Sequence, residues 1–294
     1  MTRRRRWTVR LLVASVVAIL AVLVPAAVAA PAPMARAGSY VALGDSYTAG
    51  PFIPLQLNHP LGCLRSDHNY PHLAAPSLGV TELRDASCSG ARTDHMTQPQ
   101  DVTPGPNPPQ FDRLGTDTSV VTIGIGGNDI GFTEIIENCS SLSPFGHPCQ
   151  DRYVANGRDE ISARIAATAP KVAAVLKDIH QRSPRATVYV VGYLDILPET
   201  GVGCWPQMPI AYDDVPYLRA KEHELNAMLG TQAASAKAVY VDTYTPSIGH
   251  DACQIETVRW VEPVVPTAPA APVHPNADGM AATARFVLAA AGRG

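Results

Sequence analysis

Five short segments of the chain are rich in apolar and β-branched residues. They cover residues 39–43, 80–86, 119–125, 187–193 and 238–242. In the last three segments the apolar residues follow one another almost without interruption, which is typical of strands that are covered on both faces. The pattern therefore predicts a buried parallel sheet.

Helical patterns lie between these segments. Between residues 172 and 179 the apolar residues recur at the spacing of one helical face, and Pro170 is suited to the first turn of that helix. A second helix is predicted over 217–233. A third begins after Asn276, a favourable N-cap residue. The alternation of strands and helices predicts an α/β fold with helices on both faces of the sheet.

Four long segments that are polar or rich in proline interrupt this pattern, at 94–112, 138–157, 199–216 and 243–273. Segments of this length without regular structure are uncommon in a compact domain unless they have a function. In open α/β sheets, ligands bind beyond the carboxyl ends of the strands. We therefore expect these loops to form the walls of a substrate cleft.

The N-terminal 37 residues have the features of a secretory signal peptide. A basic start is followed by a run of apolar residues, which ends at Pro25, and by small-residue motifs that end at Ala29 and Ala37. Cleavage is expected after one of these two alanines. The apolar run is short for a membrane span, so we expect a secreted, extracellular protein with no stable membrane anchor after processing.

The charge of the processed chain limits its partners. The whole chain carries a formal net charge of −3, but residues 1–37 contain six arginines and no acidic residue. Their removal leaves 17 basic and 26 acidic side chains, and hence a net charge of −9. This sign argues against nucleic acid and anionic lipid headgroups as partners. Residues 38–294 are long enough for one large domain, which we expect to be a monomer.

All six cysteines lie in the part of the chain that is expected to be exported. They form no C-x-x-C pair, which disfavours a zinc site, and we expect neither a metal nor a cofactor. An even number of cysteines in an exported chain predicts three disulfides. Of the fifteen possible connectivities, sequential pairing is the simplest.

Candidate catalytic residues follow the predicted strands. Ser46 in "GDSYTAG" follows the first strand, Gly90 in "SCSGA" the second and Asn128 in "GGND" the third. His274 in "APVHPNADG" precedes the final helix. If the sheet is parallel, all four residues lie near the same edge. A serine becomes an effective nucleophile when a base such as histidine removes its proton, and glycine and asparagine can supply donors for an oxyanion.

With these four motifs in this order, the mature chain resembles the SGNH, or GDSL, hydrolase superfamily, and within it the secreted actinobacterial lipases and esterases. The resemblance implies a three-layer α/β/α sandwich with five parallel strands in flavodoxin-like order. It implies Ser46 as the nucleophile, His274 as the general base, and Gly90 and Asn128 as parts of the oxyanion hole. The cysteine spacing implies the pairs Cys63–Cys88, Cys139–Cys149 and Cys204–Cys253.

The implied function is hydrolysis of carboxylic esters, above all lipid esters, through an acyl-serine intermediate. Two alternatives use the same scaffold: an acyltransferase, which passes the acyl group to an alcohol, and a phospholipase. A non-catalytic binding protein is a third, although the four motif residues are intact. The sequence holds no G-x-S-x-G motif, which disfavours an α/β-hydrolase.

The chain departs from the family pattern at one position. The family has an aspartate three residues before the base, but here that residue is Ala271. We expect a backbone carbonyl, most simply that of Ala271, to orient His274. Asp251, Glu256 and Glu262 are the alternatives. Because a carbonyl carries no full charge, and because a helix begins after His274, we expect a lowered pKa for this histidine.

Other residues near the motifs receive more ordinary roles. Asp45 is expected to cap a helix or stabilise a turn, and Asp129 to be structural. Trp260 is equally suited to a cleft wall and to the core. The acyl pocket is expected in the loops 94–112 and 199–216, which contain Met96, Phe111, Trp205 and Met208.

Overall fold

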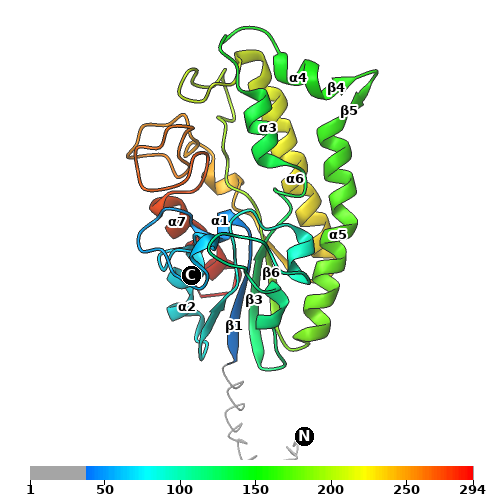
Figure 1. Cartoon of the computed structure of the whole chain (residues 1–294), viewed down its shortest axis with the longest axis vertical. Coiled ribbons are helices and arrows are strands. Elements are labelled where there is room, and N and C mark those ends of the chain that lie inside the picture. Colours follow the sequence, from blue (N-terminus) through cyan, green and yellow to red (C-terminus); the bar gives the residue numbers. More distant parts are fainter. Residues whose placement is uncertain (1–37, 294) are drawn as a thin grey trace, which may run out of the picture. The chain divides into compact units, whose positions relative to one another are not determined.

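Residues 38–293 are described by a computed structural model of the chain, in which five parallel strands form one sheet (Figure 1). The strands are β1 (Ser39–Gly44), β2 (Leu83–Asp85), β3 (Thr118–Gly124), β6 (Thr187–Val191) and β7 (Val239–Val241). Their spatial order is β2-β1-β3-β6-β7, and all four neighbouring pairs are parallel. This is the predicted flavodoxin-like order. The expected signal peptide lies outside the described residues.

Helices cover both faces of this sheet. Helix α2 packs against α7 on one side, and α5 packs against α6 on the other (Figure 1). The three predicted layers are therefore confirmed. The helices are α1 (Ser46–Ala49), α2 (Tyr70–Leu78), α3 (Phe132–Cys139), α4 (Pro148–Tyr153), α5 (Glu160–Arg182), α6 (Val215–Ser235) and α7 (Ala277–Ala290). A short antiparallel pair, β4 (Val154–Ala155) and β5 (Arg158–Asp159), precedes α5.

The alternation of side chains along the strands divides the core into two parts. In β1, Val41 and Leu43 belong to the larger cluster of buried apolar residues, which includes those of α5 and α6. Tyr40 and Ala42 belong to the smaller cluster, with residues of α2 and α7. Neighbouring residues of a strand point to opposite faces, so each strand serves both clusters. The near-continuous apolar runs of the sequence are explained by this burial on both faces.

Helix α5 differs from the prediction at its N-terminal end. Pro170, which was expected in the first turn, lies in the helix interior, and the helix begins ten residues earlier at Glu160. The Asp159 side chain caps it by accepting a hydrogen bond from the Ser162 N–H. An interior proline costs roughly 3 kcal/mol. The burial of Ile161 and Ile165 along the same helical face offsets this cost.

Several shorter elements were not predicted from the pattern. Helices α2, α3 and α4 are each nine residues or fewer. Strand β2 is shorter than the predicted segment 80–86 and lies at the edge of the sheet. Among residues 38–293, no helix is both long enough and apolar enough to cross a membrane.

Three disulfides connect the loops: Cys63–Cys88, Cys139–Cys149 and Cys204–Cys253. These are the pairs that the family resemblance implies. The bridges close chain segments of 25, 10 and 49 residues, which restricts the unfolded chain. Two of them connect loops that follow the carboxyl ends of strands, so they brace the edge of the sheet where the candidate residues lie.

Candidate active site

Ser46 lies at the junction between β1 and α1. Gly44 at the end of the strand has a φ of 147°, and a Cβ atom there would lie 2.3 Å from the Thr48 hydroxyl oxygen. Only glycine fits this turn without a clash. Asp45 caps α1 through a 2.9 Å hydrogen bond from the Tyr47 N–H, the role expected for it. The turn thus leaves Ser46 as the first helical residue, at the carboxyl edge of the sheet.

His274 contacts Ser46 directly. Its Nε2 atom lies 2.7 Å from the Ser46 hydroxyl oxygen, although the two residues are 228 positions apart. The other ring nitrogen, Nδ1, lies 2.7 Å from the backbone carbonyl oxygen of Pro272. Since a carbonyl can only accept, Nδ1 carries the proton and Nε2 is free to accept the proton of the serine. This is the arrangement that a general base requires.

The carbonyl that orients the ring belongs to Pro272, one residue after the expected Ala271. The reason is the backbone at Val273, which has a φ of 58° in the left-handed region. A β-branched residue rarely adopts this conformation, and the turn directs the Pro272 carbonyl toward the ring of the second following residue. The Tyr47 hydroxyl donates a 2.8 Å hydrogen bond to the Val273 carbonyl and holds the turn in place.

The three carboxylates considered as alternatives have other surroundings. Glu262 is fully buried and pairs with Arg259 at 2.9 Å, and it also accepts from the Asn276 side chain. Asp251 accepts from the Cys253 N–H, and Glu256 is exposed. None of the three forms a hydrogen bond with His274 within the described chain. Glu262 instead fixes the loop, because its backbone N–H donates to the His274 carbonyl.

The surroundings of His274 favour its neutral form. Burial lowers the pKa of the ring below its ordinary value, because removal from water disfavours the charged imidazolium. The hydrogen bond to the Pro272 carbonyl acts in the opposite direction, but its effect is smaller. The direction of the shift is the expected one.

Asn128 lines the same pocket as Ser46 and contacts the segment that carries Gly90. Gly90 has a φ of 78°, a conformation that favours glycine. The Asn128 side chain donates a 3.0 Å hydrogen bond to the carbonyl of Ala91, which follows this glycine. Within residues 38–293, the backbone N–H groups of Ser46 and Gly90 have no hydrogen-bond acceptor. They are available to an oxygen atom of a substrate.

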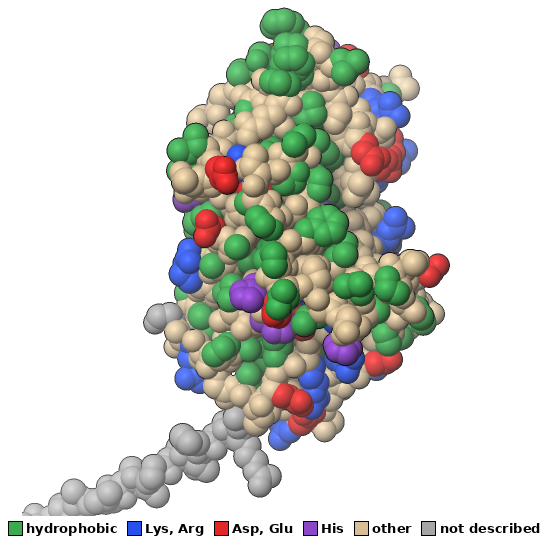
Figure 2. All heavy atoms as spheres, turned by 60° about the vertical axis from the view of Figure 1, so that its left-hand side comes forward, with side chains coloured by type: hydrophobic (Ala, Val, Ile, Leu, Met, Phe, Trp, Pro, Cys, Tyr) green, Lys and Arg blue, Asp and Glu red, His purple; other side chains and the backbone are tan. Residues whose placement is uncertain are grey.

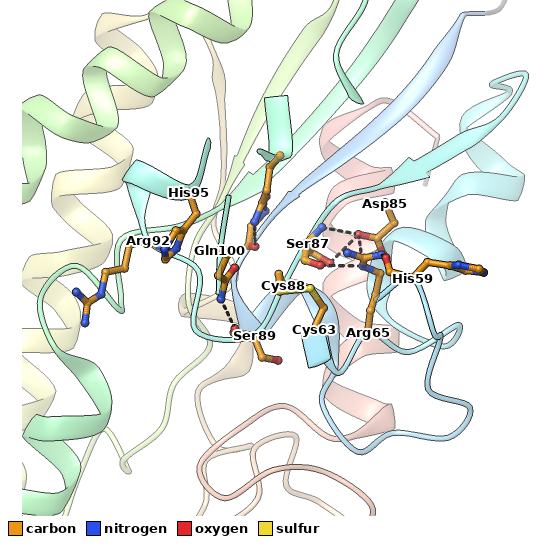
Figure 3. Close-up of a disulfide and its surroundings, with 12 residues drawn as sticks. His59, Cys63, Arg65, Asp85, Ser87, Cys88, Ser89, Arg92, His95 and Gln100 are labelled. Atoms are coloured by element: carbon orange, nitrogen blue, oxygen red, sulfur yellow. Dashed lines mark hydrogen bonds and ion pairs between the residues drawn. A yellow bond between two sulfur atoms is a disulfide. The ribbon is translucent and has the colours of Figure 1, made fainter. Parts of the chain in front are cut away.

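A network of contacts fixes the segment that carries Gly90 (Figure 3). The Cys63–Cys88 disulfide ties it to the loop after α1, and the Cys88 N–H donates to the carbonyl of Gly44. Arg65, which is 4% exposed, donates to the Ser87 carbonyl at 2.8 Å, and Gln100 donates to the Ser89 carbonyl at 2.7 Å. These contacts hold the residues before Gly90 in one position.

Tyr193, which the sequence reasoning missed, connects the strand ends. Its hydroxyl donates to Asp45 at 2.6 Å and accepts from the Gly127 N–H at 2.8 Å. Burial raises the pKa of Asp45 to about 7, while the bond from Tyr193 opposes the shift. Asp129 accepts from the backbone and hydroxyl of Thr93, so it is structural, as expected. A tyrosine at a strand end gave no sequence signal for this connection.

An apolar pocket adjoins Ser46, Asn128 and Gly127. Its walls come mainly from α3, α6 and the segment after β6. The apolar residues that line it include Phe132, Ile135, Ile136, Leu197, Leu218 and Leu225. This mainly apolar lining, which begins at the serine, suits an alkyl chain.

The prediction of which residues line the acyl pocket is therefore wrong. Met96, Phe111 and Met208 are buried in the core, with exposures of 0%, 2% and 1%. Trp205 donates to the Ser141 carbonyl, away from the pocket wall. The unpredicted helix α3, which follows the "GGND" loop directly, forms part of the wall instead. Trp260 stacks on His250 and packs against Phe286.

Comparisons with known proteins agree with this geometry. The model of the GDSL-like lipase/acylhydrolase family matches residues 42–282. Lipase 2 of Streptomyces coelicolor is 42% identical to this chain over 258 residues, which are 85% of this chain and 85% of the relative.

Two solved structures have a similar fold. Phospholipase A1 from Streptomyces albidoflavus NA297 superposes with a TM-score of 0.72 at 25% identity, over 86% of this chain and 99% of the other. An extracellular lipase from Streptomyces rimosus has a TM-score of 0.68 at 26% identity, over 86% and 100%.

Proposed function

Because the chain belongs to the GDSL-like lipase/acylhydrolase family and is a carboxylic ester hydrolase of the lipase and esterase class, we propose that it cleaves lipid esters through an acyl-serine intermediate on Ser46. The observation that carries the proposal is the 2.7 Å contact between Ser46 and His274. The Ser46 side chain lies at the mouth of an apolar pocket, where an acyl chain and its carbonyl carbon can be placed together.

The first half of the reaction forms the acyl-enzyme. Nε2 of His274 takes the proton of the Ser46 hydroxyl as the oxygen bonds to the ester carbonyl carbon. The carbonyl π electrons move onto its oxygen, which becomes an oxyanion. When the intermediate collapses, the bond to the alcohol oxygen breaks, and His274 gives its proton to this leaving group. A water molecule then repeats the sequence and releases the acid.

The oxyanion is stabilised by donors that are already in place. We assign this role to the backbone N–H groups of Ser46 and Gly90 and to the side-chain amide of Asn128. The unused N–H groups and the contact between Asn128 and Ala91 support the assignment. Loss of one such donor typically raises the barrier by about 3–4 kcal/mol.

The Pro272 carbonyl takes the part that a carboxylate plays in a catalytic triad. It accepts the proton of Nδ1 and so fixes the tautomer in which Nε2 can act as a base. A carbonyl dipole stabilises the imidazolium less than a full charge would. The proposed machinery is therefore a Ser46–His274 dyad with a main-chain orienting group.

We also propose that the protein is exported and acts outside the cell as a monomer without a retained anchor. The three disulfides support an oxidising compartment, and the similar lipase from Streptomyces rimosus is extracellular. The signal peptide proposed for residues 1–37 accounts for the export. Mass spectrometry of the protein recovered from culture medium would identify the first residue of the mature chain.

Substitution of the nucleophile tests the proposed mechanism. Ser46→Ala removes the only atom that can form the acyl-enzyme, so hydrolysis of p-nitrophenyl octanoate is expected to fall by at least about a thousandfold. The variant should keep the circular dichroism spectrum and melting temperature of the wild type. Trapping of the acyl group on the Ser46 peptide, followed by mass spectrometry, provides an independent test. A folded variant that retains wild-type activity would rule out the assignment.

A further inference from the structure

Two acidic side chains, Asp45 and Glu222, line the apolar pocket beside Ser46, and the mechanism uses neither. Both carboxyl oxygens of Asp45 already accept hydrogen bonds, one from the Tyr47 N–H and one from the Tyr193 hydroxyl. Glu222 lies on α6 and lines the pocket together with Leu218 and Leu225. The spacing of these three residues places them on one face of the helix. The carboxyl group of Glu222 therefore lies between two leucines of the pocket wall.

The hydrogen-bond partners of the pocket wall single out this carboxyl group. The hydroxyls of Tyr47 and Tyr193 each donate to a protein oxygen, and the Lys221 ammonium contacts two carboxylates. Oε2 of Glu222 accepts from the Ile196 N–H at 3.3 Å. Its other oxygen, Oε1, is buried and has no hydrogen-bond partner in the part of the chain that the structure describes.

The protonation of Glu222 decides what this oxygen can bind. Burial is the main cause that raises the pKa of Glu222 well above its usual range, and the nearby Asp195 raises it further. Burial thus favours the neutral carboxylic acid, which can both donate and accept a hydrogen bond. A buried polar group without a partner is unfavourable, so a ligand that supplies a partner gains affinity.

The position of His274 determines which part of the ester enters the pocket. His274 gives its proton to the leaving alcohol, so the alcohol must lie on the side of this residue. His274 is not part of the pocket wall, which begins at Ser46 and continues along Asn128 and Phe132. The chain that enters the pocket is therefore the acyl chain, and Glu222 faces it.

We propose that Glu222 is a specificity-determining residue that hydrogen-bonds to an oxygen atom carried by the acyl chain, so that esters of oxygenated fatty acids are preferred over unsubstituted esters of the same length. The proposal rests on the proposed function, because it places the acyl chain in the pocket during catalysis. An unsubstituted chain leaves Oε1 without a partner. A ketone or hydroxyl oxygen at the matching carbon supplies one and displaces no other contact of the wall.

The test compares p-nitrophenyl octanoate with isomeric oxooctanoates in which the ketone occupies successive carbons. In the wild type, the ratio of kcat/KM for the oxo ester to that for octanoate is expected to peak, at about tenfold, at one position. Glu222→Gln should keep the peak, since its amide still donates. Glu222→Leu should abolish it. Leu225→Met, which alters the wall without adding a polar group, should change both rates together.

Each ratio compares two substrates of one enzyme sample. A misfolded fraction lowers both rates equally and therefore cancels in the ratio. A flat series in the wild type, or an unchanged peak in Glu222→Leu, would overturn the inference. Should that variant not fold, Glu222→Met takes its place, and the wild-type series remains decisive alone. A wild type that hydrolyses none of these esters would contradict the proposed function itself, whereas hydrolysis of all of them at one rate would contradict only the role of Glu222.

Discussion

At the scale of single residues, the catalytic atoms are divided between side chains and the main chain. The serine hydroxyl, the imidazole and the Asn128 amide are side-chain groups. The orienting carbonyl of Pro272 is a main-chain group, placed by the left-handed conformation of Val273. Local strain of this kind persists where the surrounding contacts enforce it, and here the Tyr47 hydroxyl and the backbone of Glu262 hold the turn.

The pH dependence of hydrolysis reports on His274. Its lowered pKa keeps Nε2 unprotonated in mild acid, so the acid limb of kcat/KM is expected below about pH 6.5, the ordinary value for histidine. The measurement is a pH profile of kcat/KM with a soluble ester. The pKa of Asp45 is raised to about 7, so Asp45→Asn serves as the control and should keep the same limb. An acid limb centred above pH 7 would instead indicate a carboxylate beside the ring.

At the scale of elements, the nucleophile and the oxyanion donors lie on three loops that follow β1, β2 and β3, and the base lies on the loop between β7 and α7. Tyr193 joins the first and third loops through Asp45 and Gly127. The Cys63–Cys88 disulfide and Arg65 fix the second (Figure 3). These cross-connections explain how a parallel sheet, which only brings the strand ends to one edge, holds the donors close to one atom.

The Cys63–Cys88 and Cys139–Cys149 disulfides are expected to differ in their effect on catalysis. Replacement of both Cys63 and Cys88 by serine should lower the free energy of unfolding by about 3–4 kcal/mol. It should also lower kcat, because Cys88 lies two residues before Gly90. The same change at Cys139 and Cys149 should cost about 3 kcal/mol and leave kcat within about twofold. Urea unfolding and kcat on a soluble ester provide the two measurements. Equal losses of kcat in the two double variants would contradict this account of the Gly90 segment.

At the scale of the whole molecule, the side formed by the long loops is largely uncharged. Figure 2 brings this side forward and shows hydrophobic side chains at its upper end and down its middle, with many charged groups toward the edges. Beneath the surface, however, the protein buries several acidic groups. Asp195 is fully buried, and neither of its carboxyl oxygens has a partner within residues 38–293.

The stability of the fold should therefore fall as Asp195 ionises. Burial, followed by repulsion from Asp251, raises its pKa to about 7 in the folded state. The folded chain thus binds this proton more tightly than the unfolded chain does. The associated stability is fully present below about pH 4 and is lost as the pH rises through about 7. Asp195→Asn cannot ionise, so it should be more stable than the wild type at about pH 8, by on the order of 1 kcal/mol, and nearly equal at about pH 4.

Urea unfolding of both proteins at the two pH values provides the measurement. A variant that is no more stable than the wild type at the higher pH would contradict the account of Asp195.

Much of the fold could be read from the sequence, because β3 and β6 are buried on both faces and their apolar runs record that burial. The start of α5 could not, since Pro170 is a local signal that tertiary packing of Ile161 and Ile165 overrides. At the site, the sequence motifs indicated Ser46 and His274 but not Pro272, because the accepting atom depends on one backbone angle. The pocket wall was missed because α3 is too short to show a clear period.

The Pro272 carbonyl has a consequence for how this enzyme can vary. A nucleotide change in the gene alters a side chain, but it leaves every carbonyl of the polypeptide where the chain path puts it. A missense mutation therefore cannot remove the backbone carbonyl that orients the imidazole, whereas it can replace an orienting aspartate by another residue. Drift in the composition of this loop is compatible with activity as long as the path from Val261 to Pro275 is retained.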